Sequence, residues 1–364
     1  MKTIKIGTAK AKPGHLTYGF IKALQLPTGF TDQIPVMIAQ GKTEGPTFVI
    51  TANVHGNELT GIAVIHELVT QELAQEVTGT VVAIPSLNPT GLRAYARSPD
   101  YDPKDPNRLY PEGRFAKKKD EDEDTKFPER YELVAKRIFA YLKKYADFHL
   151  DLHNHALRSI PYSILDRIFY TDEKDKPNAL KLASQQKGMV EAFGALYTAD
   201  FPAKKYMKLK YHRSVSGATL NTLRIPAFTI ELGANNVLYP EIVRGSLKGT
   251  RNVLKWAGML EGPYAKITEF PTPQPTKRLR RIEHPRTKRS GIIRFLVEPG
   301  EQVKKGQSIA RITDLVGRPL GDGFIRTDHD GYMIALYSEI TKYENDAIAE
   351  MGILDTEDII APMP

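Results

Sequence analysis

The sequence predicts an α/β fold followed by a smaller β-rich domain, and three observations support this. Apolar, β-branched segments alternate with longer segments whose apolar residues recur at helical spacing. A proline-rich run at residues 270–275 ends that alternation, because closely spaced prolines neither continue a helix nor occupy a central strand. The length of 364 residues exceeds the usual size of one domain. We therefore expect a catalytic domain over residues 1–270 and a β-rich domain over residues 271–364.

Five strands and four helices are expected before the proline-rich run. The expected strands are residues 34–39, 47–52, 79–84, 145–151 and 226–231. The expected helices lie near residues 59–76, 128–144, 178–194 and 240–257. Beyond the run, short strands are expected near 291–297 and 308–313, joined by a segment rich in turn residues.

Three side chains with the chemistry of metal ligands stand at the ends of two expected strands. His55 and Glu58 follow strand 47–52, and Gly56 lets the backbone turn sharply between them. His153 follows the expected strand 145–151, and functional groups of α/β sheets collect at such strand ends. A solvated surface pair is the alternative for His55 and Glu58 alone, but the glycine-rich turn and the distant histidine favour a metal site.

The expected metal is one Zn²⁺ per chain, held by His55, Glu58 and His153. Two ligands close in sequence and one distant ligand leave the fourth tetrahedral position to water, as in catalytic zinc sites. Structural zinc sites are commonly closed by thiolates, and this chain has no cysteine.

These residues belong to an ordered set of motifs. The set comprises His55-Gly56-Asn57-Glu58, Asn88-Pro89, residues 106–111, Asp151-Leu152-His153 and residues 229–233. In their order and spacing, from about residue 47 to 233, the chain resembles the succinylglutamate desuccinylase/aspartoacylase family of the zinc carboxypeptidase superfamily. The resemblance implies a zinc-carboxypeptidase-like mixed sheet flanked by helices, with a smaller C-terminal β-sandwich or barrel-like domain. It also implies a zinc-dependent hydrolase that cleaves an amide bond next to a free carboxylate, with metal-bound water as the nucleophile.

Glu231 is the general base that this resemblance implies. It ends an apolar strand, where partial burial raises the pKa of a carboxylate toward the range useful for proton transfer. A glutamate at a strand end could equally cap a neighbouring helix.

Asn107 and Arg108 resemble the family's pair for binding a substrate carboxylate, since arginine presents a planar fork and asparagine an orienting donor. A surface turn is the alternative for this Asp-Pro-Asn segment. The family's oxyanion-stabilising arginine falls at Asp100 in the usual register, so we choose Arg97 as that catalytic residue, with Arg93 second.

Three neighbours of His153 are assigned supporting or structural roles. Asp151 is expected to orient a ligand by hydrogen bonding. His155 is interpreted as a pocket residue or as merely structural, and Arg158 as a surface residue rather than a pocket charge.

The C-terminal domain resembles the β-sandwich module of the same family and, more loosely, biotinyl or lipoyl carrier domains. A carrier would need a lysine at the hairpin tip, and residues 327–332 contain none, so a structural or pocket-shaping module is expected. Relatives often take a substrate-contacting tyrosine from this module, and Tyr332, Tyr337 and Tyr343 are the candidates.

The formal net charge is +8, but its distribution argues against nucleic acid as a partner. The basic run 117–119 is followed at once by the acidic run 120–124, and the basic run 277–281 is interpreted as exposed charge without a nucleic-acid-binding motif. No apolar run is long enough for a membrane span, and the first residues do not resemble a signal peptide, so we expect a cytoplasmic protein.

The expected partner is a small N-acyl amino acid, with short peptides and a carboxypeptidase activity as the alternative. A noncatalytic zinc-binding or ligand-binding protein is a further alternative, but binding alone does not require Glu231. The sequence leaves the oligomeric state open, a homo-oligomer included.

Overall fold

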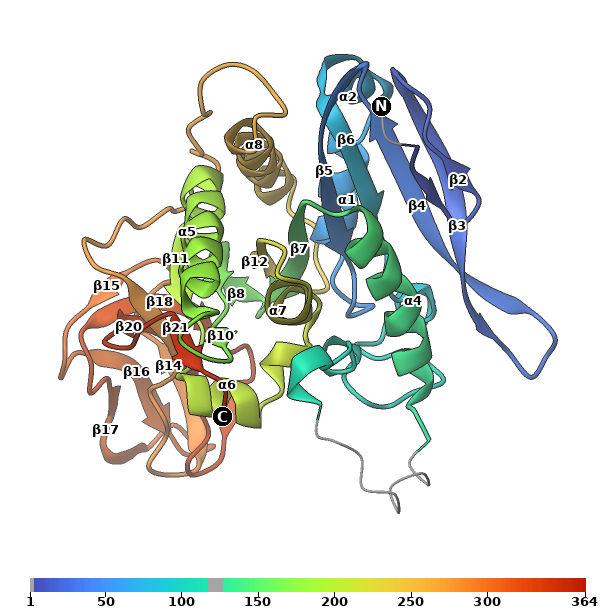
Figure 1. Cartoon of the computed structure of the whole chain (residues 1–364). Helices are drawn as coiled ribbons and strands as arrows, with labels where there is room; N and C mark the ends of the chain where they lie inside the picture. Colours follow the sequence, from blue (N-terminus) through green and yellow to red (C-terminus); the bar gives the residue numbers. More distant parts are fainter. Residues whose placement is uncertain (1–2, 117–126) are drawn as a thin grey trace.

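The computed structural model describes residues 3–116 and 127–364, which form one large mixed sheet with helices on both faces (Figure 1). The charged runs 117–119 and 120–124 lie outside the described residues. Along the sheet, the strands that precede the proline-rich run are β3 (His15–Gln25), β4 (Thr31–Gln40), β6 (Thr78–Ile84), β5 (Thr43–Ala52), β7 (Phe148–His155), β12 (Ala227–Ala234), β9 (Tyr162–Leu165) and β11 (Leu196–Ala199).

The four central strands β6, β5, β7 and β12 are parallel, and β4 and β9 flank them antiparallel. The outermost strand β3 pairs antiparallel with β4. The sheet continues into strands from the C-terminal part: β13 (Leu279–Glu283), β20 (Ala349–Leu354), β18 (Gly331–Leu336) and β15 (Gln302–Val303), with β8 (Arg158–Ser159) beside β18. The segment 271–278 carries no helix or strand, yet β13 pairs in parallel with β11. The boundary at residue 270 therefore stays a prediction, and the sheet runs across it.

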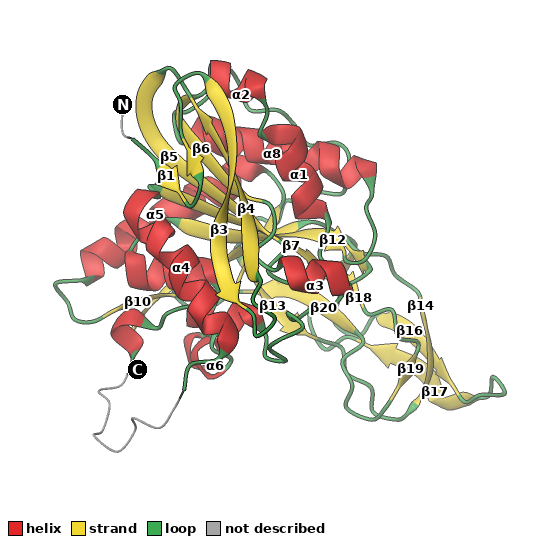
Figure 2. Cartoon of the chain, turned by 90° about the vertical axis from the view of Figure 1, so that its right-hand side faces the viewer, coloured by secondary structure: helices red, strands yellow, loops and turns green. Residues whose placement is uncertain are grey.

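Three small sheets complete the fold. They are β1 (Lys5–Ile6) with β2 (Ala9–Lys10), β10 (Ile168–Tyr170) with β21 (Ile360–Pro362), and the antiparallel sheet β17 (Pro319–Arg326), β16 (Ser308–Thr313), β14 (Gly291–Phe295) and β19 (Thr341–Lys342). Figure 2 shows the last of these as a β-rich region that projects from one end of the molecule. The expected mixed α/β fold with a C-terminal β region is confirmed.

The helices are α1 (Thr60–Leu68), α2 (Gln71–Glu76), α3 (Pro89–Ala94), α4 (Arg130–Tyr145), α5 (Lys176–Phe193), α6 (Ala203–Lys208), α7 (Val215–Ala218) and α8 (Pro240–Trp256). Short turns of 3₁₀ helix lie at η1 (Pro106–Arg108), η2 (Gly113–Phe115) and η4 (Tyr211–Arg213), and a π-helical turn lies at η5 (Thr219–Leu223). The predicted single helix over residues 59–76 is wrong in one respect, because it is two helices: α1 ends at Leu68 and α2 begins at Gln71. The side chain of Thr70 accepts a hydrogen bond from the Leu73 N–H and begins α2.

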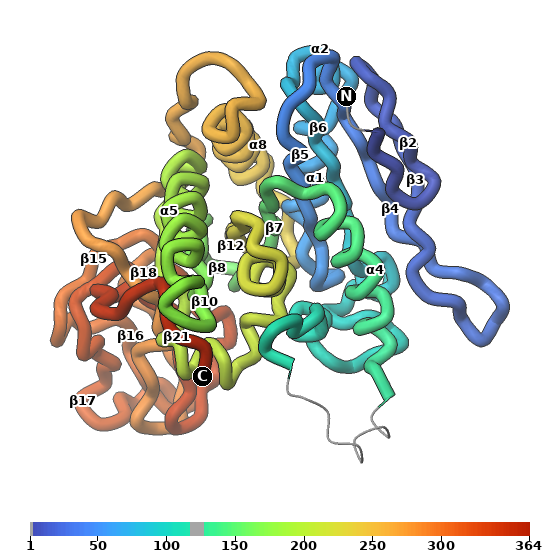
Figure 3. The backbone as a smooth tube through the Cα atoms, viewed as in Figure 1, coloured from blue at the N-terminus to red at the C-terminus, as the bar shows by residue number. Residues whose placement is uncertain are grey.

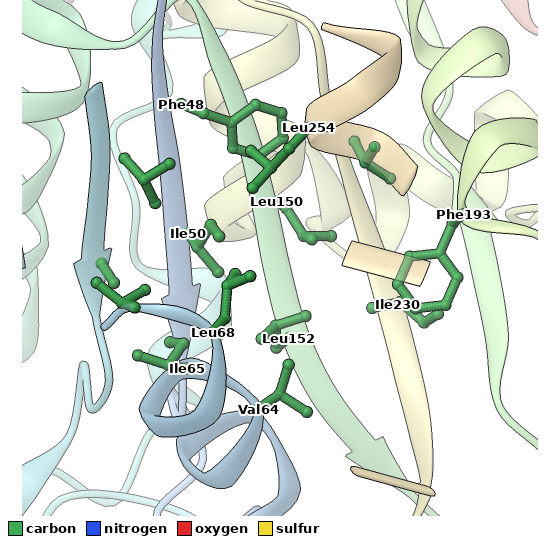
Figure 4. Packing of buried hydrophobic residues seen from close by; sticks show 14 of the residues in the cluster. Phe48, Ile50, Val64, Ile65, Leu68, Leu150, Leu152, Phe193, Ile230 and Leu254 are labelled. Carbon is green, nitrogen blue, oxygen red and sulfur yellow. The ribbon is translucent and has the colours of Figure 1, made fainter. Parts of the chain in front are cut away.

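The alternation of side chains along the strands creates a core on each face of the sheet. Phe48 and Ile50 of β5 point to the face covered by α1, α2, α5 and α8, whose packing Figure 4 shows. Val49 points to the opposite face, where α4 and α7 cover the sheet. Burial on both faces explains why the central strands read as continuous apolar runs.

The two central strands that matter for the site run side by side through the middle of the molecule. Figure 3 shows β7 and β12 between the N-terminal strands, in blue, and the C-terminal region, in orange and red. Their carboxyl ends therefore meet the C-terminal region at one edge of the sheet. Among the described residues, none of the helices has the length and apolar character that crossing a membrane requires.

Candidate active site

A tight turn after β5 presents the first two predicted ligands. Asn53 adopts a left-handed backbone with φ of 55°, and its Nδ2 donates to the carbonyl groups of His55, Gly56 and Glu58 at 3.0, 3.1 and 2.8 Å. A Cβ on Gly56 would lie 2.0 Å from the carbonyl carbon of Gly91, so the turn has no room for a side chain there. The local sequence thus fixes the direction of both ligand side chains.

The structure brings His55, Glu58 and His153 together. The Glu58 carboxylate lies between the two rings, with Oε1 2.6 Å from His55 Nδ1 and Oε2 2.9 Å from His153 Nδ1. One ligand atom from each residue lies within 4.8 Å of the others, and all three side chains are buried. Two imidazole nitrogens and one carboxylate oxygen are a donor set that suits Zn²⁺, so the residues fit the expected metal.

Carboxylates hold the opposite nitrogens of both rings. Asp151 Oδ2 lies 2.8 Å from His153 Nε2, and Asp105 Oδ1 lies 2.9 Å from His55 Nε2. Thr51 in turn donates to the other oxygen of Asp151 at 2.6 Å. Such partners fix the orientation of a metal-ligating imidazole and raise its basicity.

The charges of this cluster depend on one another. Burial opposes protonation of His153, but the carboxylates of Asp151 and Glu58 raise its pKa well above the usual value. Burial also opposes ionisation of Glu58, but His55 and His153 hold its pKa far below the usual range. The cluster therefore carries a buried carboxylate that requires a positive partner, which protons or a metal cation supply.

Glu231 lies next to the ligand cluster on β12. The parallel register pairs Glu231 with His153, so both side chains belong to the same edge of the sheet. Glu231 Oε2 is buried and has no hydrogen-bond partner among the described residues. Burial raises its pKa above the usual value, against the opposing effect of His153 and His155. A carboxylate with a raised pKa and a free oxygen is suited to accepting a proton.

Asn107 and Arg108 lie on η1 and both line the cavity beside the ligand cluster. Asn107 Oδ1 accepts from the Val215 N–H at 2.8 Å, and its Nδ2 lies 3.4 Å from His153 Nε2. The Arg108 guanidinium lies 4.0 Å from the ring centre of Tyr211. Stacking and the backbone contact orient the pair toward the cavity.

The two candidate oxyanion arginines have different environments. Arg97 lines the cavity, with Nη2 3.0 Å from Asp105 Oδ2 and Nη1 3.7 Å from Glu58 Oε1. Arg93 is exposed and pairs with Asp100 at 3.5 Å, outside the cavity lining. The geometry favours Arg97 of the two.

The cavity at this edge of the sheet has a volume of about 230 Å³. Its wall is built from both parts of the chain, and the C-terminal part contributes Arg281, Glu283, Tyr337 and Glu350. Tyr337 is the only one of the three candidate tyrosines in this wall. The C-terminal region therefore shapes the cavity.

The interpretation of the basic run 277–281 as exposed charge is wrong for Arg281, which is 6% exposed. The alternation along β13 turns Arg281 inward, where Nε donates to Asp200 at 2.9 Å and Nη1 lies 3.6 Å from Glu350. His155 lines the cavity and lies 3.3 Å from Glu350, whereas Arg158 lies outside the cavity lining and pairs with Glu298.

Several residues of the site escaped the sequence analysis. They are Asp105, Asp166, Asp200, Tyr211 and Glu350. Asp105 directly precedes the Pro-Asn-Arg motif, which offers a signal that could have found it. The others come from segments without a distinctive motif.

Comparison with known proteins assigns the family. The model of the succinylglutamate desuccinylase/aspartoacylase catalytic domain matches residues 44–257. The chain belongs to this family of amide-bond deacylases and is a hydrolase of that class.

Individual relatives agree with this assignment. The chain is 26% identical over 322 residues to N-alpha-acetyl-L-2,4-diaminobutyric acid deacetylase from Halomonas elongata, covering 87% of this chain and 84% of that protein. Its fold is similar to a succinylglutamate desuccinylase from Silicibacter sp. TM1040, at 20% identity and a TM-score of 0.71, covering 94% of this chain and 95% of that one. It is also similar to the ectoine utilization protein EutE from Ruegeria pomeroyi, at 21% identity and a TM-score of 0.69, covering 93% and 95%.

Proposed function

We propose that this protein is a zinc-dependent deacylase that hydrolyses the amide bond of a small N-acyl amino acid. The observation that carries the proposal is the convergence of His55, Glu58 and His153 in a cavity whose wall also contains Glu231. The relative from Halomonas elongata, named as a deacetylase of an acetylated amino acid, supports this substrate class.

The Asn107 and Arg108 pair is proposed to bind the free carboxylate of the substrate. Arg108 offers a planar fork of donors whose orientation is set by Tyr211. Asn107 lies within reach of both Val215 and His153, so a carboxylate bound there lies beside the proposed metal. Binding at this point would place the neighbouring amide bond near Glu231.

His55, Glu58 and His153 would hold one zinc ion, which when bound acts as a Lewis acid toward the amide carbonyl and the attacking water. Glu231 Oε2 accepts a proton from that water as the water oxygen adds to the carbonyl carbon. Glu231 then returns the proton to the amide nitrogen as the carbon–nitrogen bond breaks, which yields a carboxylic acid and an amine. Arg97 donates a hydrogen bond to the developing oxyanion.

Two other functions are less well supported. A carboxypeptidase acting on short peptides would need room for further residues, and a cavity of about 230 Å³ favours a small substrate. A noncatalytic binding protein would have no use for the buried, unpaired carboxylate oxygen of Glu231.

The test is hydrolysis of a panel of N-acyl amino acids and dipeptides by zinc-loaded protein. Glu231→Gln should lower kcat about 100- to 10,000-fold while zinc content and substrate binding persist, because only proton transfer is lost. A zinc-loaded wild-type protein that cleaves no member of the panel, or a fully active Glu231→Gln variant, would overturn the proposal.

A further inference from the structure

Asp166 lies at the end of the cavity away from the proposed metal. The β12 and β9 strands pair Glu231 with Tyr162 and Thr229 with Ile164, and Asp166 follows two residues beyond Ile164. Because two strand residues span about 7 Å, each of these steps leads further from the metal ligands. Thr229 and Asp166 are joined through the hydroxyl of Ser216, which lies 2.8 Å from each of them.

Asp166 is a buried carboxylate without a basic partner. It is 3% exposed and lines the cavity. Its Oδ2 accepts from Ser216, and its Oδ1 accepts from the Tyr206 hydroxyl at 2.8 Å. Within residues 3–116 and 127–364, no lysine, arginine or histidine forms an ion pair with it.

The neighbouring charged groups do not supply Asp166 with the basic partner that it lacks among the described residues. Asp200 lies next to Asp166, since its N–H donates to the Leu165 carbonyl at 2.9 Å, and the Arg281 guanidinium is engaged by Asp200 and Glu350. Burial foremost, and then Asp200, raise the pKa of Asp166 to about 7, whereas the hydroxyl groups and Arg281 lower it less. A buried carboxylate in this state is stabilised by any cation that enters the cavity.

A second carboxylate on the substrate would be poorly accommodated here. Arg108 and Arg281 both pack on the ring of Tyr211, and the proposed function assigns Arg108 to the first substrate carboxylate. Arg281 is already paired with Asp200 and Glu350, and the described cavity wall also holds the carboxylates of Asp166 and Glu283. Like charges in a buried site repel strongly, so this end discriminates against anions.

We propose that Asp166 is a specificity-determining residue that binds a free ammonium group of the substrate. The substrate class is then a diamino acid acylated on one nitrogen, whose second nitrogen remains a cation. The proposal rests on the proposed deacylase function, with the carboxylate at Arg108, the amide at the metal cluster and the ammonium group at Asp166. It assigns a role to Asp166, a cavity residue that the proposed chemistry does not use.

The experiment compares zinc-loaded wild-type protein with Asp166→Asn on matched substrates. The pair is an N-acyl diamino acid and its analogue in which a hydroxyl replaces the free ammonium group. Wild type should prefer the diamino substrate, and Asp166→Asn should lower kcat/KM for that substrate about 10- to 100-fold, because a charged hydrogen bond is lost. The analogue should be affected less than threefold. The control Asp322→Asn removes an exposed carboxylate of β17 outside the cavity and should change neither value.

Three results would overturn the inference. Equal losses on both substrates in a variant with unchanged zinc content would assign Asp166 a structural role. A wild-type preference for the hydroxyl analogue, or for an N-acyl dicarboxylic amino acid, would show that the cavity does not select an ammonium group. These two results overturn the inference even if Asp166→Asn fails to fold. In each case hydrolysis by the wild type would leave the deacylase function standing, whereas no hydrolysis of any substrate would remove the function itself.

Discussion

Oδ2 of Asp151 lies 2.8 Å from Nε2 of His153, on the side of the ring that faces away from Glu58. The two residues are separated by one position on β7, and Thr51 of the neighbouring strand holds the second oxygen of Asp151. This contact leaves Nδ1 as the ligand atom of His153, next to the carboxylate of Glu58. The sheet therefore orients the ring through Asp151 and Thr51.

Replacing Asp151 with Asn should weaken zinc binding about 10- to 100-fold, because the imidazole loses its charged outer partner. Competition with a chelator of known affinity measures this effect. The matched variant Asp147→Asn changes a carboxylate near the start of the same strand, where it accepts from the Thr47 N–H, and should leave zinc affinity unaltered. Equal affinities for wild type and Asp151→Asn would show that the contact does not orient the ligand.

Gly56→Ala should destabilise the protein by about 1–3 kcal/mol or more and reduce zinc content, because the new Cβ would overlap the backbone of Gly91. Thermal unfolding and metal analysis measure the two effects. A variant with the wild-type melting temperature and full zinc content would mean that the turn after β5 adapts readily.

Arg108→Lys should raise KM about tenfold or more while kcat changes less, because lysine offers neither the planar fork nor the stacking on Tyr211. Steady-state kinetics on a cleaved N-acyl amino acid measures it. If instead kcat falls and KM stays constant, Arg108 acts on the reacting atoms and not on the substrate carboxylate.

Stability should fall in acid partly because of Glu350. Burial disfavours its ionisation, but His155 and Arg281 lower its pKa to about 2 from 4.5. A depressed pKa means that this stabilisation is present above pH 4.5 and is lost as the pH falls toward about 2. Glu350→Gln should therefore be less stable than wild type at pH 7, and the difference should shrink as the pH falls from 4.5 toward about 2. Denaturant unfolding at several pH values measures it, and a difference that is constant with pH would contradict the assignment.

The sequence predicted the central strands and the ligand set because these features are local. Strand β5 is an apolar run buried on both faces, and the turn that follows it contains His55, Gly56 and Glu58. The edge strand β3 was missed, because large apolar side chains such as Tyr18 and Phe20 are exposed while the buried positions that alternate with them include the small residues Gly19 and Ala23. Local sequence patterns therefore predicted the central strands of the sheet better than its edge strand.

The cavity wall was harder to predict, because it depends on contacts between distant segments. Arg281 stands in a basic run that resembles exposed charge, and only the pairing of β13 with β11 brings it to Asp200. Asp166 likewise has no motif, and its position follows from the antiparallel pairing of β9 with β12. Pairings of this kind are not encoded in the spacing of neighbouring residues.

The most direct test of the central claim is a zinc titration of metal-free protein in which activity and bound zinc are followed together. We expect that activity toward an N-acyl amino acid rises in proportion to bound zinc and stops rising at one zinc per chain, and that His153→Ala gains neither bound zinc nor activity. Full activity of the metal-free protein, or zinc-dependent activity that survives in His153→Ala, would contradict it.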